Sequence, residues 1–461
     1  MEYTSTRNTQ EIFSFKDVFL KGLAPDGGLF VPKKIPSCSL DELKKFKDLS
    51  YGELATKIIL KFCENEFTDD EIRNLVKNSY KNFRTNEVVL IKKIEKINLL
   101  ELFHGPTLAF KDISMQVIGN IYEKILEKNN LKINVVVATS GDTGAAAISA
   151  IKNKKNMKIF VLHPYKKISE VQRKFMTSID SNNVFNIALE GNFDDCQKFV
   201  KSMFIDKNFN SSINMSGVNS INWSRIVVQI VYYFFSYFKV AKEHEKINFS
   251  VPTGNFGDIY AGYIAKKMGL PIDKLIIATN KNDILRRVIN TGVYKPLKVE
   301  HTVSPSMDIQ IASNFERLIF DVCSCDSKQT SKLMNDLRKN GELKLEKEQL
   351  SKIKENFYSE SLSEKETKSV INNIFKSEKI LVDPHTAVGI GVAKKFPLNK
   401  STVILATAHP AKFSDVVKEA TGIEPELPEG LKGILNKEEK YEKISKNLEK
   451  VKKYILEKVK K

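Results

Sequence analysis

Short apolar runs rich in β-branched residues alternate with longer amphipathic stretches over most of this 461-residue chain. Each run has the length of a strand, and each stretch that follows repeats its apolar positions with the period of a helix. The paired segments are 135–138 with 145–152, 158–162 with 168–176, 184–189 with 194–203, 247–251 with 258–268, 275–278 with 283–289, and 402–406 with 413–419. Repeated strand–helix units predict a parallel sheet covered by helices on both faces.

Three regions depart from this pattern. Residues 1–85 alternate turn-rich pieces with helical stretches, which predicts a small N-terminal domain. Residues 327–376 are highly charged and predict a peripheral helical region. From 435 to 461, apolar residues recur at helical spacing among many lysines, which predicts a terminal helix packed by one face.

Composition bounds the class of protein. A chain of this length with 42% hydrophobic residues can bury two or three cores. The net charge of +17 comes from lysines that are dispersed and, outside the tail, lack interleaved aromatic residues. We therefore expect solvated surfaces that attract anionic substrates, and no nucleic-acid site.

Cysteine usage bears on the compartment and on metal binding. Five scattered cysteines, with no signal peptide and no long uncharged apolar run, indicate a reduced, cytoplasmic protein that binds no membrane. Cys323 and Cys325 have neither a second pair nor a histidine at ligand spacing, so we predict no metal site.

The loop 103–113 delivers one lysine, Lys111, to the start of a predicted helix. Most lysines belong in solvent, but Lys111 follows the apolar Phe110, and two turn-rich loops elsewhere in the chain suit anions. We interpret Lys111 as the lysine that forms a Schiff base with pyridoxal phosphate. Once substrate displaces it, the freed amine moves protons, which requires a pKa lowered by burial or by positive neighbours.

One of the two loops, 252–258, follows a predicted strand and opens a helix. Its glycines permit positive φ and close approach of the backbone, so several N–H groups and the positive end of the helix aim at one point. A phosphate fits there, although a glycine pair after a strand is more often only a tight turn. The candidate cofactor-binding residues are Gly254, Asn255, Phe256 and Gly257.

The other loop, 139–144, carries hydroxyl groups as well as glycines. Ser140 and Thr143 stand where side-chain oxygens cap a helix, and a cap needs only one of them. The excess of hydroxyl and backbone donors suits a substrate carboxylate. Ser140 and Thr143 are therefore candidate substrate-binding residues.

Near the C-terminus, Thr407 ends a predicted strand in an apolar context. A neutral hydroxyl that faces the ring nitrogen of pyridoxal phosphate leaves this nitrogen unprotonated, which favours elimination and replacement over transamination. His385 and His409 lie in turns beside proline, where histidine is more often structural, and we assign them no role.

Several motifs together resemble the longer subfamily of threonine synthase, a family of pyridoxal-phosphate enzymes with the fold of tryptophan synthase β. They cover nearly the whole chain in the family's order, at 3–7, 24–29, 104–112, 139–144, 220–225, 253–258, 278–280, 305–309, 383–387 and 407–413. The resemblance implies fold type II, with two open, mostly parallel α/β domains plus an N-terminal domain. The implied divisions are 1–85 for the N-terminal domain, 86–115 with 215–430 for the large cofactor-binding domain, 116–214 for the small domain, and 431–461 for a basic C-terminal helix.

The same resemblance implies roles for site residues. Lys111 is the Schiff-base residue, residues 254–257 hold the cofactor phosphate, Thr407 faces the ring nitrogen, and the loop 140–143 binds the substrate carboxylate. Asp142 stands where many relatives of this fold carry asparagine near the phenolic oxygen of the cofactor. An ionised aspartate repels a phenolate, so the Asp142 side chain must be turned away, protonated, or bonded to another donor.

The implied reaction converts O-phospho-L-homoserine and water into L-threonine and phosphate, the last step of threonine biosynthesis. It needs a second phosphate site. Arg225, with Asn222 and Ser224 at a helix start, is the best candidate, and Lys166, Lys167 or Arg173 are alternatives. A threonine-synthase-like phospholyase, which releases a 2-oxo acid and phosphate, has the same motifs and stays open, as does the choice between a monomer and a homodimer.

Overall fold

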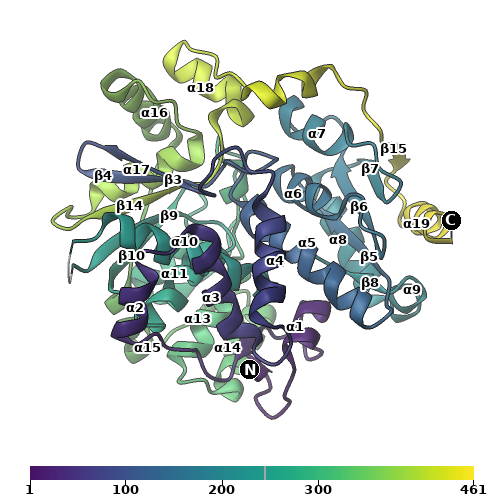
Figure 1. Ribbon diagram of the computed structural model, residues 1–461, viewed down its shortest axis with the longest axis horizontal. Coiled ribbons are helices and arrows are strands. Elements are labelled where there is room, and N and C mark those ends of the chain that lie inside the picture. The colour runs from purple at the N-terminus through teal and green to yellow at the C-terminus, as the bar shows by residue number, and fades with distance from the viewer. Residues whose placement is uncertain (243–244, 461) are drawn as a thin grey trace.

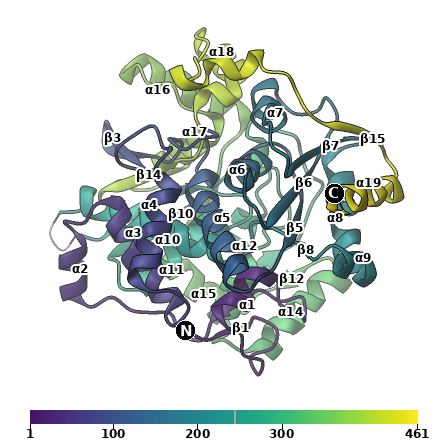
Figure 2. The same cartoon turned by 45° about the vertical axis from the view of Figure 1, so that its right-hand side comes forward.

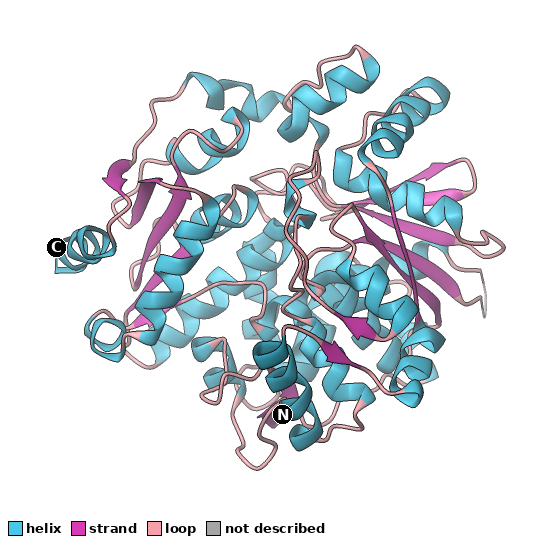
Figure 3. Cartoon of the chain, turned by 180° about the vertical axis from the view of Figure 1, so that it is seen from behind, coloured by secondary structure: helices cyan, strands magenta, loops and turns pink. Residues whose placement is uncertain are grey.

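The computed structural model describes residues 1–242 and 245–460. Two open sheets stand on opposite sides of the molecule, each covered by helices, and loops meet between them (Figures 1 and 3). Both sheets are mostly parallel. The predicted α/β class, with two open and mostly parallel sheets, is confirmed.

The larger sheet has the order β13 (Phe357–Ser361), β10 (Ile272–Thr279), β9 (Ile247–Pro252), β14 (Thr402–Ala406), β4 (Ile97–Glu101) and β3 (Leu90–Ile94). All neighbours are parallel except the hairpin of β3 and β4. Strand β14 is buried over its whole length, as expected for a parallel strand with helices on both faces. Because β9 and β14 are parallel neighbours, the loops that follow them leave the same edge of the sheet.

The smaller sheet has the order β15 (Glu442–Ser445), β7 (Val184–Glu190), β6 (Met157–Pro164), β5 (Ile133–Ala138) and β8 (Met215–Ser216), and all its pairs are parallel. Side chains of β5 alternate between two cores, because successive residues of a strand point to opposite faces. Val135 and Val137 join the main core with α5 (Lys111–Lys128) and α6 (Asp142–Ile151), whereas Val136 packs with α8 (Phe193–Ile205) and α9 (Lys207–Ser212).

The N-terminal region forms β1 (Tyr3–Ser5), paired antiparallel with β2 (Phe30–Pro32), and the helices α1 (Phe15–Lys21), α2 (Leu40–Phe46), α3 (Tyr51–Cys63) and α4 (Asp69–Tyr80). Each of the four helices begins with a capping box, in which a serine or threonine and an acid three residues later bond to each other's backbone N–H. Helix α3 packs on the central helix α10 (Trp223–Val240), which is buried on nearly all sides. The Arg7 guanidinium ties this region to Glu316 at 2.7 Å.

The remaining helices are α7 (Glu170–Thr177), α11 (Gly257–Lys267), α12 (Ile284–Thr291), α13 (Phe315–Val322), α14 (Ser327–Asn340), α15 (Lys347–Asn356), α16 (Glu364–Glu378), α17 (Pro384–Lys395), α18 (Ser414–Thr421) and α19 (Leu448–Lys460). Short 3-10 helices lie at η1 (Pro305–Met307), η2 (Pro410–Phe413) and η3 (Glu429–Asn436), and a two-residue ladder joins β11 (Val293–Tyr294) to β12 (Leu343–Lys344). Within the described residues, no helix combines the length and the apolarity that crossing a bilayer requires.

Two predicted helical segments contain strands. The charged region 327–376 includes β13, because Phe357 and Ser359 face the interior and the strand can extend the larger sheet beside β10. The stretch predicted as one helix from 435 to 461 instead forms the end of η3, strand β15 and helix α19, and Lys461 lies outside the described residues.

The C-terminal segment crosses from the larger to the smaller sheet, where β15 lies beside β7 and α19 lies next to it (Figure 2). Ile444 of β15 and Val451 and Ile455 of α19 join the core of the smaller sheet. Strand β8 also enters this sheet from beyond residue 214. The smaller sheet therefore draws on more of the chain than the range 116–214.

Candidate active site

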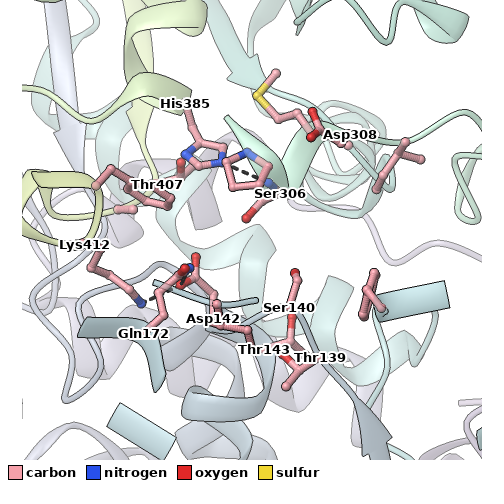
Figure 4. Close-up of a pocket in the computed structure, with 18 of the residues that line it drawn as sticks. Thr139, Ser140, Asp142, Thr143, Gln172, Ser306, Asp308, His385, Thr407 and Lys412 are labelled. Carbon is pink, nitrogen blue, oxygen red and sulfur yellow. Dashed lines mark hydrogen bonds and ion pairs between the residues drawn. The ribbon is translucent and has the colours of Figure 1, made fainter. Parts of the chain in front are cut away.

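A cavity of about 2450 Å³ opens between the two sheets. Residues at or just beyond the ends of β5, β6, β7, β9 and β14 line it, so carboxyl ends of strands from both sheets form its walls. Figure 4 shows the two walls: His385, Thr407 and Ser306 lie on one side, and Ser140, Asp142, Thr143 and Gln172 lie on the other. The cavity contains every predicted site residue except Asn222.

Lys111, the first residue of α5, points into this cavity with 12% of its side chain exposed. Its Nζ atom lies 3.5 Å from Oδ2 of Asp142 and 4.9 Å from the centre of the Phe110 ring. Burial lowers the pKa of Lys111, the Asp142 carboxylate opposes this, and the positive charges of Lys412 and Arg225 lower the pKa further. The arrangement favours the neutral amine that a nucleophilic lysine needs.

The loop 254–257 forms a concave turn before α11. Phe256 has φ +65° and directly precedes the helix, and its ring packs edge-on against Phe315 with centroids 5.3 Å apart. The carbonyl oxygen of Asn255 accepts two hydrogen bonds from Asn314, both 3.0 Å long, which hold the loop in place. Within the described chain, the N–H groups of Gly254, Asn255 and Phe256 donate to no acceptor. Three free donors at the start of a helix suit a phosphate.

The loop 139–143 leaves the hydroxyl groups of Ser140 and Thr143 free for a ligand. Thr139 satisfies the helix end, because its Oγ1 accepts from the N–H groups of Gly141 and Gly144, both at 2.9 Å. Ser140 is exposed, Thr143 is half-buried, and both line the cavity. Capping is thus performed by the neighbouring threonine and not by either candidate.

Arg225 and Asn222 have different environments although both lie at the start of α10. The Arg225 guanidinium is 4% exposed, lines the cavity, and has no hydrogen-bond partner on Nε in the described part of the chain. Burial lowers its pKa to about 10. Asn222 instead caps α10: its Oδ1 accepts from Ser224 N at 3.0 Å and Oγ at 2.6 Å, and its Nδ2 donates to Phe19 O at 3.2 Å. These bonds turn the amide away from the cavity.

The alternatives for the substrate phosphate lie elsewhere. Arg173 does not line the cavity, because its Nε bonds Glu439 of the C-terminal segment at 2.7 Å. Lys166 lies over the Tyr165 ring, 5.4 Å from its centre, and also points away. Lys167 does line the cavity. Arg225 is the more deeply buried of the two cations that remain.

Thr407 follows β14 and is buried at the cavity wall, and its carbonyl oxygen accepts from Phe110 N at 2.8 Å. This bond joins the strand end to the loop that carries Lys111. His385, which received no role from the sequence, also faces the cavity. Its Nδ1 donates to Asp383 at 2.7 Å, and its Nε2 accepts the Ser306 N–H at 3.2 Å, so the ring is held as the neutral tautomer.

Asp142 is ionised and bonded to donors from two parts of the chain. Its Oδ1 lies 2.7 Å from Nζ of Lys412 and accepts from Gln172 Nε2 at 2.9 Å. Although burial alone would raise the pKa of Asp142, the Lys412 and Lys111 charges and these hydrogen bonds hold it well below its usual range. The sequence indicated that an ionised Asp142 needs another donor beside a cofactor phenolate. It did not indicate that Lys412 is this donor, since Lys412 is only one of many lysines.

These groups fit pyridoxal phosphate on their own chemistry. Lys111 supplies an amine for its aldehyde, the three free N–H groups of 254–256 suit its phosphate, and the Thr407 hydroxyl is a neutral group for its ring nitrogen. The described residues thus offer a donor for each polar end of the cofactor.

Together, the fold and this cavity define a pyridoxal-phosphate-dependent enzyme of fold type II. The family model for pyridoxal-phosphate dependent enzymes matches residues 93–333, and the models for the threonine synthase N terminus and C-terminal region match residues 2–80 and 386–455. The chain belongs to the threonine synthase family, and its cofactor is pyridoxal phosphate.

Individual relatives support this membership over the full length. Threonine synthase of Pseudomonas aeruginosa is 41% identical over 459 residues, which cover 99% of this chain and 98% of the relative. Threonine synthase of Saccharomyces cerevisiae is 42% identical, with 91% of this chain and 88% of the relative covered. A crystal structure of threonine synthase with bound pyridoxal phosphate from Brucella melitensis superimposes with a TM-score of 0.97 at 41% identity and covers all of both chains.

Proposed function

We propose that this protein converts O-phospho-L-homoserine and water into L-threonine and phosphate, with Lys111 as the residue that moves protons. The observation that carries the proposal is one cavity in which a buried lysine amine lies with three separate groups of anion donors. These donors are the N–H groups of 254–256, the loop 140–143 and Arg225. The reaction brings together three anionic groups, namely the cofactor phosphate, the substrate carboxylate and the substrate phosphate.

The chain's own groups divide the work. Bound pyridoxal phosphate supplies a sink for the electron pair left when a proton leaves a substrate carbon. Lys111 Nζ takes protons from Cα and Cβ of the substrate, for which its lowered pKa is suited. Phosphate leaves Cγ with the electron pair of the C–O bond, Cγ gains a proton, and water then adds its oxygen to Cβ and a proton to Cα.

Arg225 is proposed to hold the substrate phosphate. A buried guanidinium with an unpaired Nε is costly unless an anion binds it, and arginine matches phosphate geometry with two parallel hydrogen bonds. The cofactor phosphate is the alternative ligand of Arg225, because the Arg225 charge also acts on Asp258 beside the 254–257 loop. Ser140 and Thr143 are proposed to bind the substrate carboxylate. Asn222 has no part in this site, since its amide caps α10.

An isotope experiment tests the reaction. Purified holoenzyme with O-phospho-L-homoserine in H₂¹⁸O should give L-threonine with ¹⁸O in its hydroxyl group and phosphate without ¹⁸O, because the C–O bond breaks and water bonds to Cβ. A 2-oxo acid in place of threonine would establish the phospholyase alternative. Homoserine with labelled phosphate would refute both, since it reports cleavage of the P–O bond by water.

The proposal extends to compartment and assembly. We propose a cytoplasmic enzyme that is a monomer or a homodimer. The cysteines support the compartment, because all five are free thiols in the described chain and four of them are buried. Light scattering of the purified holoenzyme decides between the two assemblies, and a mass above two chains would exclude both.

A further inference from the structure

Lys412 is a second lysine beside the site and is fully buried, with 0% of its side chain exposed. It lies in η2, directly after the loop that carries Thr407. Its Nζ donates to Thr107 O at 2.7 Å. The same Nζ lies 2.7 Å from Oδ1 of Asp142 (Figure 4). Charged lysines are almost never fully buried unless they are paired, so this position requires the Asp142 carboxylate.

The pair joins the two α/β halves of the molecule at the cavity. Thr107 lies in the loop after β4 and Lys412 in η2 after β14, both at the edge of the larger sheet. Asp142 begins α6, and Gln172 belongs to α7 beside the smaller sheet. Asp142 directs Oδ1 to Lys412 and Gln172, and Oδ2 to Lys111. The Asp142 carboxylate thus lies between two lysines. Of these, only Lys111 has to act as a neutral amine in the proposed reaction.

The charge on Lys412 decides how strongly Asp142 holds a proton on Lys111. With Lys412 present, Asp142 has a full counter-ion at 2.7 Å, and the contact to Lys111 is longer, at 3.5 Å. Without it, the buried carboxylate would have Lys111 as its nearest cation, and the pair would favour a protonated Lys111. The other charged groups around this centre are Arg225 from α10 and Asp258 from α11, which act on Lys111, and Asp112, which acts on Lys412.

We propose that Lys412 is a positioning residue of the reaction, which takes Asp142 as its counter-ion and so leaves the Lys111 amine free to act. The proposal rests on the function proposed for Lys111. It also answers the conflict at position 142: the ion pair is neutral as a unit, so an aspartate paired with Lys412 presents no net charge to a cofactor phenolate.

A cycle of three variants tests this assignment. The readout is the pH at which Lys111 becomes reactive toward acetic anhydride in the cofactor-free full-length chain, followed by mass spectrometry of its peptide. Only the neutral amine reacts, so the midpoint follows the ionisation of Lys111. Exposed lysines such as Lys339 on α14 serve as internal controls in the same sample.

Lys412→Met should raise the midpoint by about 1 to 3 pH units, the range expected for an opposite charge a few ångströms away that has lost its counter-ion. Asp142→Asn should lower it. Asp142→Asn combined with Lys412→Met removes both charges and should return the midpoint close to that of wild type. This double variant buries no unpaired charge, so we expect it to fold even if Lys412→Met does not. Its midpoint, compared with that of Asp142→Asn, then still measures the influence of Lys412 on Lys111.

Two results would overturn the inference. One is a folded Lys412→Met variant whose Lys111 midpoint equals that of wild type. The other is a double variant whose midpoint equals that of Asp142→Asn, because Lys412 then exerts no influence on Lys111. Neither result depends on which product the holoenzyme forms. If the wild-type holoenzyme gave no threonine, the proposed function would be wrong. The labelling midpoints would still test whether Lys412 controls the ionisation of Lys111.

Discussion

Gly254→Ala probes the phosphate loop at the point where it has least room. An alanine Cβ at this position would lie 2.7 Å from Ser306 O and 3.1 Å from Ile309 Cδ1. Carbon atoms pack at roughly 3.5–4.0 Å from their non-bonded carbon neighbours, so the methyl group cannot fit without movement. The Ile309 side chain can turn aside, but Ser306 O is backbone and the Ser306 N–H is bonded to His385.

The loop must therefore move, and the size of the effect follows from the cost of overpacking. Inserting a methyl group into a packed site costs about 1 to 3 kcal/mol. The cofactor-free loop can relax away from Ser306, whereas the cofactor-bound loop must return to hold the phosphate. The cost then appears as a cofactor dissociation constant raised roughly 5- to 150-fold.

The assay is an absorbance titration of the cofactor-free chain with pyridoxal phosphate, accompanied by a thermal melt of the same sample. Gly430→Ala is the matched control, because a Cβ at Gly430 would meet nothing within 4 Å. If the loop cannot relax in the free chain, the cost appears instead as a lower melting temperature. A Gly254→Ala variant with the dissociation constant and melting temperature of Gly430→Ala would refute the reasoning.

Four further predictions follow from the site. Lys111→Ala should abolish both turnover and the borohydride-fixed link to the cofactor; near wild-type turnover would remove Lys111 from its role. Thr407→Asp should lower threonine formation by protonating the ring nitrogen, and an unaltered rate and product ratio would exclude Thr407. Arg225→Ala should raise KM for O-phospho-L-homoserine far more than the cofactor dissociation constant; the reverse pattern would assign Arg225 to the cofactor phosphate. Burial raises the pKa of Asp258 to about 6, above its unfolded value, so Asp258 itself contributes a loss of stability as pH rises from about 4 to 6. Asp258→Asn should flatten that loss in urea unfolding of the cofactor-free chain, and an unchanged slope would contradict the shift.

The sequence alone determined the strand–helix alternation and the residues that accompany it. The segment 402–406 is a strand with the predicted bounds, β9 ends one residue later than predicted, and α11 begins and ends one residue earlier than predicted. These elements are predictable because their buried runs and turn glycines are local signals. Lys111, the 254–257 loop, the 140–143 loop and Thr407 were likewise identified from their neighbours in sequence, and Arg225 from the reaction that the family resemblance implies. The fold brings all of them to one cavity.

Tertiary structure decided what depends on partners distant in sequence. Residues 442–445 have a helical pattern, yet they form β15 because the open edge of β7 offers unpaired backbone groups. Asn222 belongs to a motif that includes Arg225, yet it faces Phe19, because packing of the N-terminal region against α10 sets its direction.

Lys412 gives the clearest case of this division. It lies in the motif 407–413, but its local sequence predicts neither its burial nor its partner. Only the approach of η2 to α6 buries its amine against Asp142, and burial turns an ordinary side chain into a required counter-ion. The physical reason is general. Sequence patterns indicate which surfaces must be buried, whereas the electrostatic energy of a charged side chain depends on which opposite charge the folded chain places beside it.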